Sequence, residues 1–306
     1  MRHFQATCIS MFYFLPRILL LLFLLLGSRL AAQEADRSAY LGVQGALSSY
    51  QGDLQPNSFS FSQSGKWGSI WVRKPISSHF SVKAGLGMGN IQAADANNRD
   101  YLKLRNLSFK SSIQEAFLEL DFTILNADNN RFLPYLHGGV SVFHFNPYTY
   151  DAAGQKYYLQ PLGTEGQGLP SMPGTKLYKL CQPALTVGGG IRYAISRNVT
   201  IGINASQRKT FTDFIDDVSG AYADEAELLQ LRGPKTVELA YRGDELGNGS
   251  GYPKAGEQRG MPTEMDWYYF AGLTLEIKFN AIGKLFGNLR PDQNDWYNKR
   301  CPPVRL

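Results

Sequence analysis

The sequence predicts an all-β protein: an eight-stranded antiparallel up-and-down transmembrane β-barrel with long extracellular loops and short periplasmic turns. Three observations support this fold class. Extended segments alternate apolar and polar residues with a period of two. The connections between these segments alternate between long and short. Aromatic residues gather near the ends of the segments, where a membrane barrel carries its interfacial girdles.

Eight segments rich in β-branched and aromatic residues are expected to be strands. They are Tyr40–Tyr50, Trp67–Lys74, Phe80–Gln92, Leu107–Leu125, Leu133–Phe145, Leu177–Ile195, Val199–Phe211 and Asp266–Asn280. The last of them shows the alternation clearly, because one face carries only apolar residues: Leu273, Leu275, Ile277 and Phe279. Its other face carries Thr274, Glu276 and Lys278. Such segments are strands with one apolar and one polar face.

The connections between the strands differ strongly in length. The long ones are 51–66, 93–106, 146–176 and 212–265, and the short ones are 75–79, 126–132 and 196–198. A compact soluble domain rarely contains a structureless loop as long as the last one. A transmembrane barrel has short periplasmic turns and long outer loops, and an even strand number places both termini in the periplasm.

The strand ends are rich in aromatic residues, which we expect to form interfacial girdles. They are Tyr40, Tyr50, Trp67, Phe80, Phe145, Tyr148, Tyr150, Tyr193, Phe211, Trp267, Tyr268 and Phe279. The alternative is a soluble β-sandwich, in which the apolar faces of two sheets pack on each other. In the barrel these faces contact lipid, and closure pairs every backbone N–H and C=O group that hydrocarbon cannot satisfy.

The N-terminus predicts a secretory signal peptide over residues 1–32, followed by the barrel over 33–280 and a periplasmic tail over 281–306. The apolar run Ile18–Leu26 is too short for the alternative, a membrane-spanning helix of about 20 residues. Removing residues 1–32 takes away three arginines and no acidic residue, which lowers the formal net charge from +5 to +2. A nucleic-acid partner is therefore not indicated.

Two cysteines, Cys181 and Cys301, remain after the signal peptide is removed. The predicted topology places Cys181 near the outer end of a strand and Cys301 in the periplasm. A disulfide needs Cα atoms within about 7 Å of each other. We therefore expect no bond between them.

The polar faces of the strands carry charged residues of both signs, which point into the barrel. They are Glu115, Glu119, Asp121, Glu276, Arg73, Lys83, Arg192, Arg208 and Lys278. Eight strands enclose a space that side chains fill, and an isolated buried charge is very costly. We therefore expect a structural network of ion pairs. The alternative, a catalytic carboxylate pair, needs a cleft and a route for substrate.

Other chemistry is thinly represented, and we expect no enzyme, no catalytic residue, no cofactor and no bound metal. His79, His137 and His144 lack the spacing of metal ligands. The mid-strand glycines 85, 87, 89 and 188–190 make room for large neighbours or allow curvature; a dinucleotide loop would need a following helix. The acidic stretch after Thr212 could bind calcium, but its spacing is not that of an EF-hand. A hydrogen-bonded loop is the expected structure.

Several motifs resemble the PorG-type outer-membrane barrels of the type IX secretion system of Bacteroidetes. They are YQGDL (50–54), LRNLSFKSSIQEAFLELDF (104–122), FNPYTY (145–150), LQPLGTEGQG (159–168), TDFIDDVSGAY (212–222) and RGP (232–234). The loop residues that carry this resemblance are Asn146, Pro147, Thr164, Glu165, Gly166, Gln167, Gly168, Asp213, Asp216 and Asp217. The chain departs from the pattern after residue 280.

This resemblance implies a non-enzymatic outer-membrane barrel that anchors or scaffolds a periplasmic ring, made of a lipoprotein and a partner ring protein, and supports export of cargo. Such a barrel is not itself the translocation pore. The basic tail is a candidate docking segment through Arg290, Trp296, Tyr297, Lys299 and Arg300. Two alternatives stay open: a small solute- or ligand-binding outer-membrane barrel, and a lipid-modifying barrel enzyme.

Overall fold

The structure, a computed structural model, describes residues 37–57, 61–247, 249 and 251–281. The predicted signal peptide and all but the first residue of the predicted tail lie outside the described residues. The five candidate docking residues and Cys301 are among those outside, so the predictions that concern them stay predictions. The described part of the chain contains no helix that is both long enough and apolar enough to cross a membrane.

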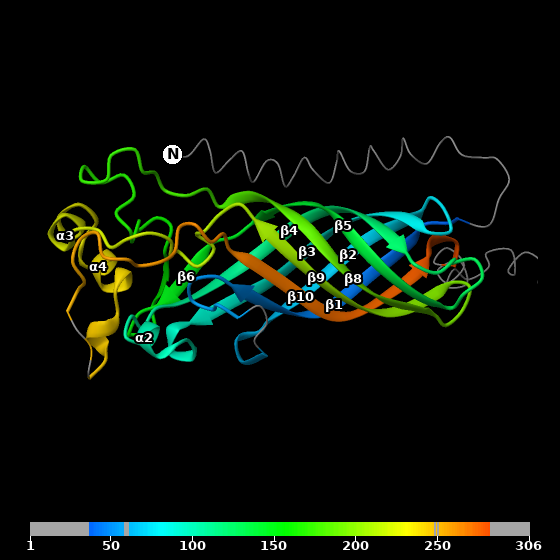
Figure 1. Cartoon of the computed structure of the whole chain (residues 1–306), viewed down its shortest axis with the longest axis horizontal. Helices are drawn as coiled ribbons and strands as arrows, with labels where there is room; N and C mark the ends of the chain where they lie inside the picture. Colours follow the sequence, from blue (N-terminus) through cyan, green and yellow to red (C-terminus); the bar gives the residue numbers. More distant parts are fainter. Residues whose placement is uncertain (1–36, 58–60, 248, 250, 282–306) are drawn as a thin grey trace, which may run out of the picture. The chain divides into compact units, whose positions relative to one another are not determined.

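Eight antiparallel strands close on themselves into a barrel (Figure 1). They are β1 (Tyr40–Gln51), β2 (Gly65–Pro75), β3 (Phe80–Ala94), β4 (Ser108–Thr123), β5 (Phe132–His144), β8 (Cys181–Ala194), β9 (Val199–Thr210) and β10 (Trp267–Lys278). Each of these eight strands pairs with the next one in this order. The barrel closes where β1 pairs with β10, from Tyr40 opposite Lys278 to Gln51 opposite Trp267. The predicted fold class is confirmed, with boundaries shifted by only a few residues.

The two ends of the barrel differ in the way the prediction requires. One end, here called the turn end, has the short connections 76–79, 124–131 and 195–198. The other, the loop end, has the long connections, and Figure 1 shows β6 and the helices gathered there. These contain the hairpin β6 (Pro147–Tyr150) and β7 (Lys156–Tyr158), in which β6 extends the sheet along β4. They also contain α2 (Asp100–Lys103), α3 (Glu225–Arg232), α4 (Pro234–Ala240) and three 3-10 turns: η1 (Phe61–Gln63), η2 (Asp95–Asn97) and η3 (Gly243–Glu245).

The outer face of the barrel is an apolar band to which every strand contributes. Its members include Val43, Ile70, Leu86, Leu118, Val140, Val187, Ile203 and Leu273, all exposed. At the turn end this outer band finishes in exposed rings from Phe80, Phe122, Phe132, Tyr193 and Phe279. Phe80 and Phe122 lie with ring centroids 5.2 Å apart. An exposed apolar surface of this continuity marks a contact with a membrane or a partner.

The loop-end half of the interior is filled by an aromatic plug: Tyr50, Trp67, Phe109, Phe143, Phe145, Tyr268 and Phe270. Trp67 and Phe270 stack with ring centroids 3.8 Å apart. Tyr50, Trp67, Phe145 and Tyr268 were predicted to lie in a girdle, and that prediction is wrong because their side chains point inward. These residues do lie near strand ends, as predicted. Side chains alternate between the two faces of a strand, however, and theirs fall on the inward face.

Inward-facing glycines make room for the tryptophans. A methyl group on Gly42 would lie 2.3 Å from the Trp71 indole, and one on Gly87 would lie 2.2 Å from that of Trp67. A methyl group on Gly45, in contrast, would meet no atom within 4 Å. The prediction that mid-strand glycines accommodate large neighbours therefore holds at Gly87, and the same device occurs at Gly42.

Replacing Gly42 by alanine should lower the free energy of unfolding by about 1–3 kcal/mol, because the added methyl overpacks the site against Trp71. The matched variant Gly45→Ala should change it by less than about 0.5 kcal/mol. Urea titration of the folded barrel in detergent measures both. Equal effects of the two variants would contradict the packing described here.

Candidate functional site

The turn-end half of the interior holds a lumen network of charged side chains, and it contains eight of the nine residues predicted from sequence. These are the acids Glu115, Glu119, Asp121 and Glu276 and the bases Arg73, Lys83, Arg192 and Arg208. All eight are less than 9% exposed. Four negative and four positive charges balance, which is the condition for burying them.

Arg208 on β9 joins the network to the aromatic plug. Its Nε lies 3.0 Å from both carboxylate oxygens of Glu115, and its Nη2 lies 2.8 Å from Oε1. The Tyr268 hydroxyl donates to Oε2 of the same carboxylate at 2.7 Å, and Arg208 also lies 3.3 Å from Glu119. A guanidinium engaged with one carboxylate through several N–H groups is the strongest form of charge-assisted hydrogen bond.

Arg192 on β8 bridges two carboxylates at the turn end. It bonds Asp121 on β4 and lies 3.5 Å from Glu276 on β10. Glu276 is also held by Arg73 on β2 at 2.5 Å and accepts a hydrogen bond from the Trp71 indole at 3.2 Å. These contacts join strands that are not neighbours in the sheet. The lumen network therefore ties the barrel across its interior as well as around its wall.

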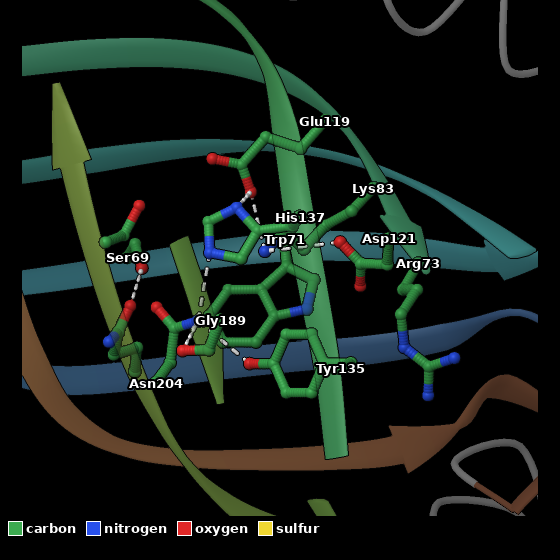
Figure 2. Close-up of polar contacts among 12 residues, drawn as sticks. Ser69, Trp71, Arg73, Lys83, Glu119, Asp121, Tyr135, His137, Gly189 and Asn204 are labelled. Carbon is green, nitrogen blue, oxygen red and sulfur yellow. Dashed lines mark hydrogen bonds and ion pairs between the residues drawn. The ribbon is translucent and has the colours of Figure 1, made fainter. Parts of the chain in front are cut away.

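His137 on β5 completes the network as a neutral side chain (Figure 2). Its Nδ1 lies 3.2 Å from Glu119, and its Nε2 lies 3.2 Å from the Asn204 amide nitrogen. That amide nitrogen also donates to the Tyr135 hydroxyl at 2.9 Å. Because an amide nitrogen can only donate, His137 Nε2 accepts, and its proton is on Nδ1 facing Glu119. Lys83 holds the same Glu119 at 2.6 Å.

Lys278 is the one predicted member that the structure does not bring into the lumen network. It lies at the turn-end limit of β10, half-buried, with its ammonium 5.6 Å from the centre of the Tyr40 ring. Strand parity placed it on the inward face, but the barrel ends at that position.

Among the described residues, the charged half of the barrel leaves little free space between its side chains. The cavity among these side chains has a volume of about 10 Å³, which is close to the minimum that one water requires. Each of the four carboxylates contacts at least one cation. The chemistry of the lumen network is that of mutual neutralisation.

The loop motifs converge on a second buried cluster, here called the loop cap, at the loop end. Thr164 donates to Asp217 at 2.5 Å, and the Tyr178 hydroxyl donates to the same carboxylate at 2.6 Å. The Glu165 carboxylate accepts from the backbone N–H groups of Ser219 at 2.8 Å and Gly220 at 3.1 Å. The two motifs 159–168 and 212–222 therefore form one hydrogen-bonded unit.

The other residues of these loop motifs lie in the same region. Gly166 and Gly168 have φ values of +72° and +81°, a conformation that favours glycine. The backbone carbonyl of Gln167 accepts from Arg232 at 2.8 Å. Asn146 lies between β5 and β6, where its N–H donates to Ser111 at 3.0 Å, and Pro147 begins β6.

Two buried arginines hold the loop cap together, and the sequence analysis missed both. Arg259 lies 3.0 Å from Glu165 and also donates to the carbonyls of Asp217 at 2.5 Å and Ala240 at 3.2 Å. Arg105 pairs with Asp95 at 2.8 Å through two nitrogens and donates to the carbonyl of Arg259. Arg105 lies within the motif 104–122, but nothing in that motif indicates its partners. Arg259 has no local signal, because Glu165 lies 94 residues away in the chain.

The loop cap contains more buried acids than bases. Burial raises the pKa of Asp213 to about 9, with the carboxyls of Asp216 and Asp53 adding to the rise. Burial also raises the pKa of Asp217 to about 6 and holds those of Asp216 and Asp266 well above the usual range. Asp266 accepts from the Tyr50 hydroxyl at 2.7 Å and from the N–H of Ile215 at 2.8 Å. In the part of the chain that the structure describes, no three acids, histidines or cysteines are arranged to hold a metal ion.

Comparison with known proteins gives one family match. A family model described as a domain of unknown function, DUF6089, matches residues 16–163. This range contains the barrel strands β1 to β5 and the β6–β7 hairpin, and it stops before β8, β9 and β10. No curated protein matches the chain.

Several solved outer-membrane barrels are similar in structure. Neisserial surface protein A is 10% identical with a TM-score of 0.39, over 79% of this chain and 97% of that one. Ail of Yersinia pestis is 8% identical with a TM-score of 0.38, over 79% and 98%. OprG of Pseudomonas aeruginosa is 9% identical with a TM-score of 0.36, over 79% and 97%. At these TM-scores the likeness carries no argument about function, and the barrel rests on its own strand pairing.

The lumen network predicts strong coupling between Arg208 and Glu115. Arg208→Met should lower the free energy of unfolding by about 3–5 kcal/mol, because it leaves a buried carboxylate without its partner. The double variant with Glu115→Met should lose clearly less than the sum of the two single losses. Urea titration of the four proteins gives the coupling, and strictly additive losses would contradict the pairing. Lys103→Met in the exposed Lys103–Asp100 pair serves as the control and should have little effect.

The loop cap should lose stability as the pH rises. In the folded cap Asp217 and Asp53 keep their protons up to about pH 6 and Asp213 up to about pH 9, whereas the unfolded chain releases them near pH 4. The folded state therefore binds more protons between these limits. This contribution to stability is complete below about pH 4 and is lost as the pH rises through about 6 and then about 9.

Asp213→Asn should remove much of the loss between pH 6 and 9, because the amide imitates the protonated carboxyl. Hydrogen exchange of the backbone amides of residues 212–220, corrected for the intrinsic effect of pH, measures the opening of the loop cap. Asp244→Asn, at an exposed position, is the matched control and should leave the pH profile unchanged. Protection that increases with pH in the unsubstituted protein would show the proposed sign to be wrong.

Proposed function

We propose that this protein is a non-enzymatic barrel of the outer membrane that anchors or scaffolds the periplasmic ring of a type IX secretion system. The observation that carries the proposal is the combination of an apolar outer band with a filled, charge-balanced interior. The band suits lipid, and the interior suits neither a conduit nor a catalytic cleft. The barrel is then a stable membrane anchor.

The link to protein secretion rests on the resemblance of the loop and strand motifs to the PorG-type barrels. The motifs 159–168 and 212–222 that carry this resemblance are joined in the loop cap by Thr164–Asp217 and by Glu165 with Ser219. Because the two motifs are hydrogen-bonded to each other, they form one structural unit. This supports the proposal that they correspond to a single structural feature of the PorG-type barrels. In this reading the turn end and the tail face the periplasmic ring.

Membrane contact of the outer band is tested by placing a charge on it. Leu118, 50% exposed on β4, changed to arginine should lower the free energy of unfolding in lipid vesicles by about 2–4 kcal/mol. The equivalent change at Leu231, which is 52% exposed in α3 at the loop end, should have an effect within about 0.5 kcal/mol. Similar small effects of both variants would argue against lipid at Leu118.

The role in secretion is tested by pull-down from outer-membrane fractions of cells that carry a tagged copy of the full chain. We expect co-purification of a periplasmic lipoprotein and its ring partner, and loss of cargo export when the gene is deleted. A chain that ends at residue 280 tests the docking role of Arg290, Trp296, Tyr297, Lys299 and Arg300. Unchanged co-purification and export by that variant would remove the tail from the proposal.

The alternative of a small solute-conducting barrel predicts conductance in planar bilayers. With an internal cavity of about 10 Å³, we expect none beyond the baseline. A steady conductance that disappears when the Arg208–Glu115 pair is replaced by methionines would favour transport over scaffolding.

A further inference from the structure

A groove on the outside of the barrel at the loop end has a volume of about 260 Å³. It lies between the turn η1 and the outward faces of β3, β4 and β6. Gln92, Lys110 and Tyr148 stand in one row across these strands, because Gln92 is opposite Lys110 and Lys110 is opposite Tyr148. The intervening Phe109 points into the aromatic plug, so the row faces outward.

The groove is lined by amides, hydroxyls, aromatic rings and one ammonium group. Its polar and aromatic lining includes Gln63, Gln92, Asn97, Lys110, Tyr148 and Tyr150. None of the described residues that line it is acidic. The Lys110 ammonium lies 5.9 Å from the centre of the Tyr150 ring, and the Lys156 ammonium lies 3.6 Å from that of Tyr148. The local charge is therefore positive.

Gln63 supplies a hydrogen-bond donor without an acceptor. Its side chain is 5% exposed, and its Oε1 accepts from the N–H of Ala94 at 2.7 Å. That contact fixes the orientation of the amide, because the backbone N–H can bond only to the oxygen. The Nε2 group is buried and has no hydrogen-bond partner within the described residues. A buried donor in this state favours an acceptor supplied from the groove.

We propose that this groove binds an acidic saccharide, meaning a sugar unit that carries a carboxylate or phosphate group. Sugar hydroxyls both donate and accept, which suits the amide and hydroxyl lining. The apolar face of a sugar ring suits the exposed Tyr150 ring, which like other tyrosines combines an apolar body with a polar tip. Lys110 pairs with the anionic group as a point charge, and Gln63 Nε2 donates to a ring or hydroxyl oxygen. The site goes beyond the proposed anchoring role and does not rest on it.

The ligand has two possible sources with the same chemistry: the saccharide of a membrane lipopolysaccharide, or a free acidic oligosaccharide. The groove lies outside the strand-paired barrel wall, next to the hairpin β6–β7 at the loop end. A saccharide attached to lipid would reach it from the side of the outer band. A free one would reach it from solvent.

The test is calorimetric titration of the full chain in detergent micelles with digalacturonic acid and with neutral maltose. We expect saturable binding of digalacturonic acid, and binding of maltose at least about tenfold weaker. Lys110→Gln should lower the affinity for the acid about tenfold and leave that for maltose unchanged. Gln63→Glu keeps the acceptor for Ala94 but replaces the free donor by an oxygen, and should weaken both ligands.

Lys209→Gln is the matched control, because Lys209 is an exposed lysine on β9, on another part of the barrel. It should bind like the unsubstituted protein, and heat-modifiable gel mobility should show that all variants are folded. Absence of saturable binding by the folded protein would overturn the proposal. So would binding of digalacturonic acid by the Lys110→Gln and Gln63→Glu variants that is as tight as that of the unsubstituted protein.

A second titration separates the two sources. Lipopolysaccharide in vesicles and its lipid-free core oligosaccharide are compared on the same proteins. If Lys110→Gln weakens binding of both ligands equally, the result supports the groove and shows that the sugar alone suffices. If the protein binds the vesicles more tightly than the lipid-free oligosaccharide, the ligand is the lipid-borne saccharide. Binding of the vesicles that is insensitive to both variants would count against the groove.

Discussion

The small interior of an eight-stranded barrel is the constraint on which the rest of the structure depends. Closure pairs every strand with two neighbours and leaves a space that only side chains fill. A charge placed there has little water to solvate it and must meet an opposite charge. The balance of four acids and four bases, the neutral form of His137 and the small volume left among them all follow from that condition.

The same constraint divides the interior into two halves. Near the short turns the inward positions are charged and bind one another across the barrel. Near the long loops the inward positions are aromatic and pack with Leu54, Ile215 and Val218 from the loops. Tyr268 and Arg208 join the halves through the Glu115 carboxylate. The loops are therefore anchored in the barrel by a shared core.

Sequence reasoning was most accurate where a short-range pattern determines the structure. Alternation located all eight barrel strands. It also assigned eight of the nine lumen charges correctly to the inward face, because the direction of alternate side chains along a strand needs no knowledge of distant residues. The prediction failed for aromatic residues near strand ends, where both the place along the strand and the face of the strand had to be considered. Tyr50 and Trp67 stand near strand ends, which suggested an interfacial girdle, but their parity directs them inward.

The loop cap could not have been assembled from sequence, because most of its contacts join residues distant in the chain. Arg259 meets Glu165 and Asp217, and Arg105 meets Asp95 and the backbone of Arg259, with no spacing rule linking them. The motifs 159–168 and 212–222 signalled that these loops matter without indicating that they touch. The groove beside Gln63 was likewise invisible, since three separate strands and a turn contribute to it.

The bond between Tyr50 on the first strand and Asp266 beside the last has a consequence for evolution. It lies at the seam where the chain closes on itself, and Asp266 also holds the backbone of Ile215 in the longest loop. A lineage cannot exchange that loop for an unrelated one without also disturbing the seam. Diversification is then easier in segments outside this junction, such as the exposed tip between β6 and β7.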